Sequence, residues 1–414
     1  MFLKSIIATF DAGIMDENVL NKLKILAESA KYDVSCSSSG TVRSGKAGML
    51  GNTVGGWGIC HSFAEDGRCI SLLKVMLTNY CIYDCAYCIN RRSNDLPRAT
   101  LSVAELVDLT MEFYRRNYIE GLFLSSGVVR NPDYTMERLV RVAKDLRTIH
   151  RFNGYIHLKS IPGASRELVN EAGLYADRLS VNVEIPKEEN LKLLAPEKDH
   201  KSVYAPMRYI QQGVLESSEE RKKHRHAPRF APAGQSTQMI VGATAETDKD
   251  ILYLSSALYK GPTMRRVYYS GYISVNTYDK RLPALKQPPL VRENRLYQAD
   301  WLLRFYQFKV DEIVNDAYPD LDLEVDPKLG WALRHPEQFP VDINKADYEM
   351  LLRVPGIGVK SARLIVASRR FSKIGFYQLK KIGVVMKKAQ YFITCCELPM
   401  RTVNELTPQG VRSL

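Results

Sequence analysis

The chain has 414 residues, of which 45% are hydrophobic and 25% are charged, and its formal net charge is +12 at pH 7. Such a composition indicates a globular protein with one large domain and one or two small ones, and eight cysteines are too few for a disulfide scaffold. No stretch approaches the ~20 consecutive apolar residues of a membrane-spanning helix, and MFLKSIIATFDAGIMDE lacks the cleavage site of a secretory signal. We therefore expect a cytoplasmic protein with no membrane partner, in which clustered cysteines bind metal or react.

Residues 1–69 are expected to form an irregular N-terminal extension. Apolar residues between positions 19 and 30 recur at helical spacing. The following stretch, SCSSSGTVRSGKAGMLGNTVGGWG, is rich in glycine and serine, which is typical of an irregular loop.

Residues 70–310 alternate short apolar runs with helical patterns, which predicts an α/β core domain. Six such units in a row favour a parallel sheet wrapped by helices, either doubly wound or barrel-like, with the chemistry in the loops after the strands. The pattern alone does not choose between these two folds. The predicted strands are 72–78, 121–126, 155–159, 178–185, 237–242 and 267–275, and the predicted helices are 103–117, 136–150, 201–221, 248–259 and 294–309.

The C-terminal part divides into a linker and a basic domain. Residues 311–341 contain several prolines and acidic residues and are expected to be a linker, and residues 342–400 are expected to form a small all-α domain. Residues 342–390 hold 11 Lys and Arg but only 3 Asp and Glu. This concentration of charge favours a polyanionic partner, although a solvated basic surface would give the same count.

The stretch CIYDCAYCINRR directly follows the first predicted core strand and carries Cys81, Cys85 and Cys88. A structural zinc site usually needs four close ligands, and a thioredoxin-type redox pair needs two thiols. Three thiolates in one loop suit an iron–sulfur cube whose fourth iron stays open.

The spacing C-x3-C-x2-C, with Tyr87 before the third cysteine, resembles the radical S-adenosylmethionine (radical SAM) superfamily. The resemblance implies a partial TIM-like (βα)6 barrel, a 4Fe–4S cluster held by the three cysteines, and S-adenosylmethionine (SAM) on the open iron. It implies reductive cleavage of SAM to a 5′-deoxyadenosyl radical, with electrons from a donor such as flavodoxin or ferredoxin. The catalytic residues that contact the substrate stay unknown.

The same resemblance assigns SAM-binding residues by position. Tyr87 fills the aromatic position beside the adenine, and LFLSSG stands where the superfamily often has a GGE-like turn for the amino group of SAM. SVNVEIP resembles the ribose-binding strand, and a hydrogen-bonded polar pair is the alternative for its Asn182 and Glu184. QMIVGATAETD resembles the GxIxGxxE segment of biotin and lipoyl synthases, and a turn glycine is the alternative for Gly242. The SAM-binding candidates are Tyr87, Ser125, Ser126, Gly127, Asn182, Glu184 and Gly242. Lys159, at a strand end, is expected to point toward the same site, for substrate, SAM or an ion pair.

The basic segment contains FPVDINKADYEMLLRVPGIGVKSARLIVASRR, in which Asn344 is a candidate N-cap. The PGIG turn between two helical patterns resembles a helix-hairpin-helix motif. This resemblance implies that the turn contacts DNA phosphates without reading the sequence. A degenerate second copy surrounds Gly383, and a basic helical turn without function is the alternative. The DNA-binding candidates are Pro355, Gly356, Ile357, Gly358, Lys360 and Ser361.

Segments along the whole chain, such as AKYDVSCSSSG, LTNYCIYDCAYCINR, APAGQSTQMIVGAT and the PGIG turn, resemble a bacterial and archaeal family of radical SAM proteins assigned to DNA modification or repair. The resemblance also implies a uracil-DNA-glycosylase-like protein as a partner. Cys36, Cys60 and Cys69 are candidates for an auxiliary cluster or zinc, with buried thiols as the simpler reading.

The sequence therefore predicts a radical SAM enzyme that acts on DNA held by its C-terminal domain. One alternative is a radical SAM enzyme on RNA, protein or a small molecule, with the hairpin domain as a docking module. Another is a non-enzymatic iron–sulfur protein that binds DNA.

Overall fold

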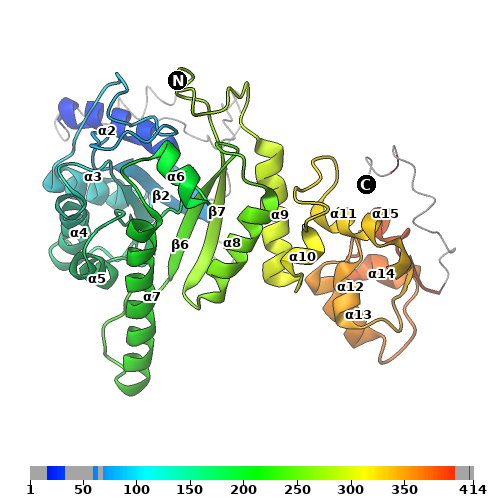
Figure 1. Cartoon of the computed structure of the whole chain (residues 1–414). Coiled ribbons are helices and arrows are strands. Elements are labelled where there is room, and N and C mark those ends of the chain that lie inside the picture. The colour runs from blue at the N-terminus through cyan, green and yellow to red at the C-terminus, as the bar shows by residue number, and fades with distance from the viewer. Residues whose placement is uncertain (1–15, 33–58, 64–68, 397–409, 411–414) are drawn as a thin grey trace, which may run out of the picture. The chain divides into compact units, whose positions relative to one another are not determined.

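The computed structural model describes residues 16–32, 59–63, 69–396 and 410. The chain divides into two compact units, which are described separately (Figure 1). Unit 1 comprises residues 1–244 and 258–288, and unit 2 comprises residues 245–257 and 289–414. The division differs from the expected end of the core at residue 310, because residues 289–310 group with the C-terminal part.

Unit 1 is built on one seven-stranded sheet whose strands lie side by side in chain order. The first strand is antiparallel to the second and the other pairs are parallel. A doubly wound sheet would reverse its strand order at a switch point, so the unbroken order selects the barrel-like alternative, a curled six-stranded half-barrel. The strands are β1 (Ile59–Phe63), β2 (Cys69–Met76), β3 (Gly121–Ser125), β4 (Tyr155–Lys159), β5 (Arg178–Ser180), β6 (Gln235–Val241) and β7 (Met264–Gly271).

Two features of the sheet differ from the sequence prediction. Strand β1 lies in the expected N-terminal extension, where no strand was predicted. Strand β5 ends at Ser180 instead of residue 185, because the backbone N–H of Val183 donates to the side chain of Thr237 (3.0 Å). Glu184 then adopts a left-handed conformation, with φ of 65°.

Helices follow the strands and cover one face of the sheet, where α3, α4, α5 and α7 lie in succession (Figure 1). The helix α3 starts with a capping box between Ser102 and Glu105, and α4 starts at Asn131 followed by Pro132. No helix among the described residues is long and apolar enough to cross a membrane. The helical segments of unit 1 are α2 (Glu17–Ser29), η1 (Ala30–Tyr32), α3 (Val103–Arg115), α4 (Pro132–Thr148), α5 (Arg166–Tyr175), α6 (Glu188–Leu194) and α7 (His200–Lys223).

The strands separate an apolar face from a mixed face. In β3 and β4 the fully buried residues Leu122, Leu124, Ile156 and Leu158 alternate with Phe123 and His157. Successive side chains of a strand point to opposite faces. The alternation therefore leaves polar groups on the face away from the apolar core.

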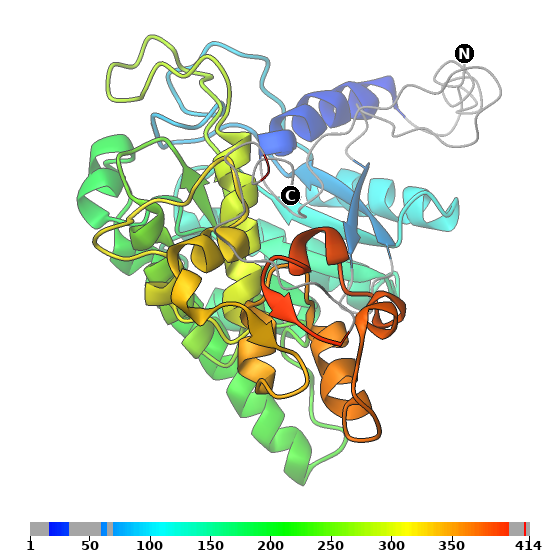
Figure 2. The ribbon, with the colours of Figure 1, turned by 90° about the vertical axis from the view of Figure 1, so that its right-hand side faces the viewer.

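Unit 2 is mainly helical and holds a small parallel pair of strands (Figure 2). The expected linker 311–341 contains α11, whose residues from Pro327 to Ala332 are buried. The elements are α8 (Asp248–Lys260, up to residue 257), α9 (Leu290–Phe305), α10 (Val310–Ile313), α11 (Pro327–Arg334), η2 (Pro336–Gln338), β8 (Val341–Asp342), α12 (Tyr348–Arg353), α13 (Val359–Ser368), α14 (Phe376–Ile382), α15 (Met386–Ala389) and β9 (Ile393–Thr394).

Asn344 does not cap a helix. Asp347 caps α12 instead, by accepting from the N–H of Met350 (2.6 Å). The side-chain amide of Asn344 donates to the carbonyl of Ile374 (3.1 Å) and accepts from its N–H (2.8 Å). Asn344 therefore fixes the loop between α13 and α14.

Two glycine turns, one between α12 and α13 and one between α14 and α15, pack against each other. Gly356 has φ of 88°, and its carbonyl accepts from the N–H of Val385 (2.9 Å). A Cβ at Gly356 would lie 2.6 Å from the carbonyl oxygen of Val385. On the other side, the hydroxyl of Ser361 lies 3.5 Å from the carbonyl of Ile382, next to the second turn. Each turn thus supports the other, and only glycine fits at position 356.

The first turn is also held by residues outside the two helical pairs. The buried Lys328 of α11 donates from Nζ to the carbonyl of Ile357 (2.6 Å), and the ring of Tyr306 lies 4.8 Å from that Nζ. The N–H of Val359 donates to the Tyr306 hydroxyl. Burial lowers the pKa of Lys328 to about 7, and Asp326 opposes this shift.

We predict that Lys328→Met changes how stability depends on pH. In the unfolded chain the Lys328 ammonium stays protonated up to about the ordinary pKa of lysine, whereas in the folded chain it loses its proton near pH 7. Between these values the unfolded state binds more protons, so this group makes stability rise with pH. From pH 7 to pH 9, the free energy of unfolding should rise on the order of 1–3 kcal/mol more in the wild type than in Lys328→Met. Denaturant unfolding followed by tryptophan fluorescence measures this, and equal pH slopes would contradict it.

Candidate active site

The three cysteines lie in an irregular loop that follows β2. This loop is held against the loop that follows β3. The N–H of Ile82 donates to the carbonyl of Val128 (2.8 Å), and the N–H of Gly127 donates to the carbonyl of Thr78 (2.8 Å). The two loops are neighbours because β2 and β3 pair in parallel, which puts their carboxyl ends at the same edge.

Gly127 is the point of closest approach between these loops. A Cβ there would lie 2.2 Å from the carbonyl oxygen of Tyr80 and 3.3 Å from the Cβ of Cys81. Any larger residue would push the cysteine loop away. The sequence assigned Gly127 to SAM binding, and the structure places it directly beside the first cysteine.

Side chains from elsewhere in unit 1 satisfy the backbone of the cysteine loop. The guanidinium of Arg98 donates to four carbonyls of the loop region, and the amide of Asn276 donates to the carbonyls of Ala86 (2.6 Å) and Cys88 (3.1 Å). A loop without regular structure has no partners of its own for these groups, and leaving them buried and unpaired would be costly. The carbonyls that accept from Arg98 belong to Asn79, Asn90, Arg91 and Asn94.

The structure brings the three thiols close enough to influence one another. Burial raises the pKa of Cys85, and it raises the pKa of Cys88 to about 12, with further increases from the neighbouring thiols. The N–H of Val128 lies 3.4 Å from the sulfur of Cys81. Three neighbouring thiolates, of which that of Cys85 is buried, would repel one another, so their deprotonated forms need a positively charged partner.

A positive charge lies beside the thiols. Lys198 Nζ lies 3.5 Å from the Tyr87 hydroxyl and 3.9 Å from a carboxylate oxygen of Glu184. Burial acts to lower the pKa of Lys198, but Cys85, Tyr87 and Glu184 together raise it well above its ordinary value. Lys198 therefore stays protonated next to the cysteine loop. It sits between α6 and α7, where no sequence signal marked it.

The other SAM-binding candidates stand at the carboxyl ends of neighbouring strands. Ser125 is buried and its hydroxyl has no hydrogen-bond partner within the described part of the chain. The hydroxyl of Ser126 donates to the carbonyl of Gly127 (2.6 Å). Asn182 is buried, with its amide 3.5 Å from that of Gln238, and Gly242 has φ of 85° directly after β6.

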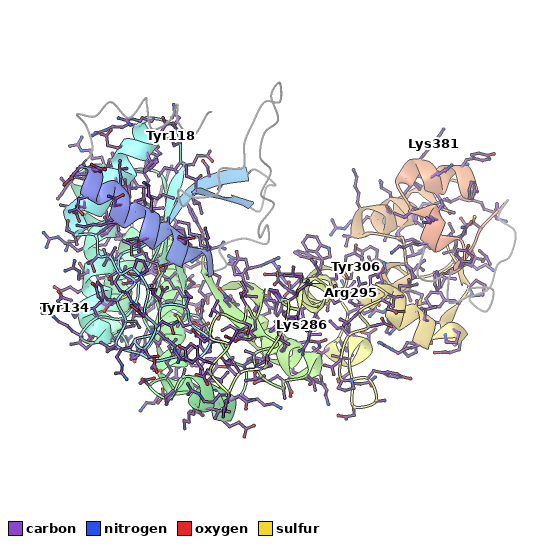
Figure 3. All side chains as sticks on the ribbon, turned by 90° about the horizontal axis from the view of Figure 1, so that it is seen from above. Tyr118, Tyr134, Lys286, Arg295, Tyr306 and Lys381 are labelled. Carbon is purple, nitrogen blue, oxygen red and sulfur yellow. The ribbon has the colours of Figure 1, made fainter. Side chains whose placement is uncertain are left out.

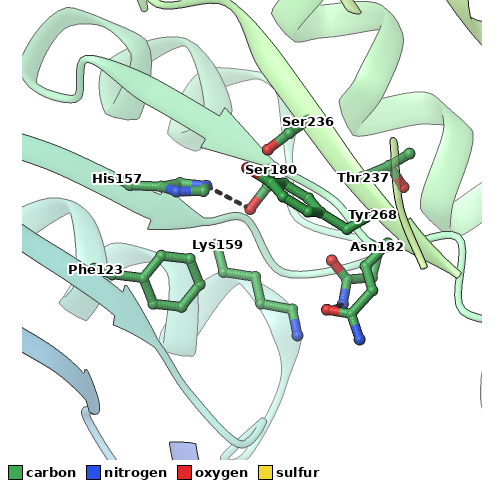
Figure 4. A pocket seen from close by; sticks show the side chains of 9 residues that line it. Phe123, His157, Lys159, Ser180, Asn182, Ser236, Thr237 and Tyr268 are labelled. Carbon is green, nitrogen blue, oxygen red and sulfur yellow. Dashed lines mark hydrogen bonds between the residues drawn. The ribbon is translucent and has the colours of Figure 1, made fainter. Parts of the chain in front are cut away.

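A small cavity lined mainly by polar side chains opens on the inner face of the half-barrel (Figure 4). His157 Nε2 lies 2.9 Å from the hydroxyl of Ser180, and the ring of Phe123 packs edge-on against His157. A purely structural barrel would fill this face with branched apolar side chains. The sequence pointed to Lys159 and Asn182 of this lining; polar residues inside otherwise apolar strands are the signal for the rest. The cavity is lined by Phe123, His157, Lys159, Ser180, Asn182, Ser236, Thr237, Gln238 and Tyr268.

The auxiliary-metal candidates are not tested. Cys36 lies outside the described residues, and so do the side chains of Cys60 and Cys69. Among the described residues, no three His, Cys, Asp or Glu side chains are grouped as ligands of a single metal ion. An iron–sulfur cube differs from such a site because each thiolate binds a different iron.

The DNA-binding candidates lie mostly inside unit 2. Pro355, Ile357 and Ser361 are buried, and Gly356 packs against the second glycine turn. Lys360 is exposed, in the first turn of α13. Among these candidates, Lys360 therefore presents its charge to solvent, whereas the turn residues shape the fold.

Comparison with known proteins identifies one part of the chain. Residues 75–217, from the end of β2 into α7, match the model of the radical SAM superfamily. A search of the curated proteins found no match.

Solved structures with similarity to this chain include two of HydG, a maturase of the [FeFe]-hydrogenase. The first is 14% identical with a TM-score of 0.42, and covers 55% of this chain and 48% of that chain. The second, from Carboxydothermus hydrogenoformans, is 15% identical with a TM-score of 0.40, and covers 55% of this chain and 49% of that chain. Coproporphyrinogen III oxidase (HemN) from Escherichia coli is 14% identical with a TM-score of 0.34, and covers 62% of this chain and 56% of that chain. The chain thus spans about half of the length of these proteins.

Proposed function

We propose that this chain, whose residues 75–217 match the radical SAM model, is a radical SAM enzyme that uses a 4Fe–4S cluster and SAM. We propose further that Cys81, Cys85 and Cys88 hold the cluster and that the substrate is DNA. The observation that carries the proposal is the placement of all three thiols in one loop, at the carboxyl end of a half-barrel with a polar interior. Unit 2 is the part proposed to bind the DNA.

The residues of the loop fit such a cluster. Three thiols share one loop, and the fourth position is left for a ligand that is not a protein side chain. When bound, the cluster supplies the electron that cleaves SAM to methionine and an adenosyl radical, which abstracts hydrogen from the substrate. The protein holds the thiols through Arg98 and Asn276 and keeps Lys198 charged beside them.

The loops after the strands are proposed to hold SAM. The buried Ser125 hydroxyl without a partner and the glycine at 127 lie after β3, next to Cys81. Glu184 and Tyr87 lie together at Lys198. An unpaired buried hydroxyl is costly unless a ligand satisfies it, so Ser125 offers a hydrogen-bonding group to a ligand held in these loops.

DNA as the substrate is supported by the charges of unit 2. From residue 350 to residue 396 the chain has ten Lys and Arg but no Asp or Glu. The paired glycine turns resemble two helix-hairpin-helix motifs, and Lys360 and Lys387 are both exposed next to them. The polar side chains that line the cavity suit the hydrogen-bonding edge of a flipped-out base.

A radical SAM enzyme acting on a small polar molecule is the second candidate, since the polar side chains that line the cavity would also suit such a substrate. The proposed electron donor is a flavodoxin or ferredoxin, and the uracil-DNA-glycosylase-like partner stays a prediction. The described cysteines are free thiols, which suits the reducing cytoplasm that we propose as the location.

We predict that the anaerobically reconstituted, reduced protein cleaves SAM to methionine and 5′-deoxyadenosine. Cys81→Ser, Cys85→Ser and Cys88→Ser should each lose more than about 90% of this activity, because removing one thiolate opens a second corner of the cluster. Product formation is measured by mass spectrometry, and bound iron by colorimetry. Cys395→Ser and Cys396→Ser, which change cysteines of unit 2 outside the proposed cluster site, are the matched controls and should behave as wild type. Full activity in the loop variants would exclude the assignment.

We predict that Lys360→Glu combined with Lys387→Glu weakens duplex DNA binding at least about tenfold. Loss of two phosphate contacts should also lower the slope of log affinity against log salt by about 1.8. Lys201→Glu, at an exposed position of α7, is the control. Gly356→Ala is a poor probe, because its Cβ would collide with Val385 and disturb the fold. Fluorescence anisotropy over a salt series is the measurement, and an unchanged slope would argue against DNA at these turns.

A further inference from the structure

Two aromatic rings are exposed to solvent near the start of α14: Phe371 precedes the helix and Tyr377 lies in its first turn. Phe371 is 90% exposed and Tyr377 is 69% exposed, the two highest values among large hydrophobic side chains in the described part of the chain. The neighbouring Ile374 and Leu379 are buried and already supply the apolar contacts of this segment. The two rings therefore contribute little to the core, although the ring of Tyr377 packs edge-on against Phe376 (5.7 Å between ring centroids).

The backbone under these rings is fixed. Asn344 makes two hydrogen bonds with the main chain of Ile374, and the guanidinium of Arg369 donates to the carbonyls of Ile343 (2.9 Å) and Ala346 (2.5 Å). Phe371 follows directly, with its N–H donating to the carbonyl of Ser368 (3.0 Å). A ring held out on a fixed loop loses little conformational freedom when it binds a partner.

Positive charges surround both rings. Arg370 and Lys373 flank Phe371 in the chain and are exposed. Lys380 and Lys381 follow Tyr377 by three and four residues on α14, which puts them on the same helix face. Figure 3 shows Lys381 pointing away from the body of unit 2.

Most of these cations have no carboxylate partner among the described residues. Of the ten Lys and Arg between residues 350 and 396, Arg353 pairs with Glu312, Lys388 pairs with Asp326, and Arg369 binds carbonyls. The other seven are exposed, and no salt bridge is found for them in the part of the chain that the structure describes: Lys360, Arg363, Arg370, Lys373, Lys380, Lys381 and Lys387.

Exposed rings interleaved with unpaired cations suit a partner that has both negative charges and flat apolar faces. A nucleic acid strand with unpaired bases has both, because its phosphates meet the cations and its bases stack on the rings. In a continuous duplex the bases are already stacked on one another and offer no free face. We propose that Phe371 and Tyr377 form a stacking site for unpaired bases, so that unit 2 selects single-stranded or locally opened DNA.

This inference rests on the proposed function and makes it more specific. A radical at the half-barrel can reach a base only after the base has left the duplex stack, which costs unstacking energy. A stacking site on the same chain would favour DNA whose bases are already unpaired and unstacked. The seven exposed cations would hold the phosphates without reading sequence.

The experiment compares binding of one labelled 20-nucleotide strand and its duplex to the full-length protein by fluorescence anisotropy. Phe371→Leu with Tyr377→Leu keeps apolar side chains but removes the planar rings. This double variant should bind the single strand at least about tenfold more weakly than wild type does, while duplex affinity changes less than about twofold. Its salt slope should stay unchanged, because every charge is kept. Phe371→Trp, which keeps a planar ring, should bind the single strand at least as tightly as wild type.

Three outcomes would overturn the inference. One is unchanged single-strand affinity in the leucine variant, and another is an equal loss for strand and duplex. The third is loss of binding to phosphatidylserine vesicles with unchanged DNA binding, which would make the rings a membrane contact. If wild type binds neither form of DNA, the proposed DNA substrate fails as well. If wild type binds duplex and the leucine variant matches it on both forms, the stacking site alone fails.

Discussion

A loop without regular structure has to hold three thiols close together, and its shape depends on contacts supplied by the rest of unit 1. The loop after β3 approaches so closely that position 127 has no room for a Cβ, and the single guanidinium of Arg98 satisfies four carbonyls. Asn276 reaches the loop from a segment that follows β7. The arrangement of the thiols thus depends on the whole curled sheet, because Arg98 follows β2 near one end of the sheet and Asn276 follows β7 at the other.

The interior of the half-barrel is polar on one face of the sheet. The sheet puts apolar side chains such as Leu122 and Ile156 on one face and His157, Ser180 and Gln238 around a cavity on the other. Burying polar groups costs stability unless they are paired, so a barrel that served only as a scaffold would not keep them. In unit 1 the polar groups discussed here line an interior cavity, whereas in unit 2 the glycine turns are packed inside and most of the charged side chains lie at the surface. Lys328 and Gly356 shape that unit, whereas Lys360 and Phe371 face solvent.

Local sequence patterns predicted much of this architecture. The six parallel strands followed from apolar runs, and the cysteine loop was recognisable because its three thiols are close in sequence. Other features depend on contacts between distant residues. Asn344 looked like an N-cap but binds Ile374, and the expected linker holds the buried helix α11 because Lys328 packs on the first glycine turn. Lys198 and Asn276 reach the site from over a hundred positions away, where no local pattern marks them.

The central claim is that three thiolates hold an iron–sulfur cube and leave one iron for SAM. Electron paramagnetic resonance of the reduced, anaerobic protein with and without SAM tests this most directly. The account predicts a 4Fe–4S signal whose g-values shift when SAM is added, because SAM binds the open iron. A zinc-containing or metal-free protein, or a cluster signal that SAM leaves unchanged, would contradict it.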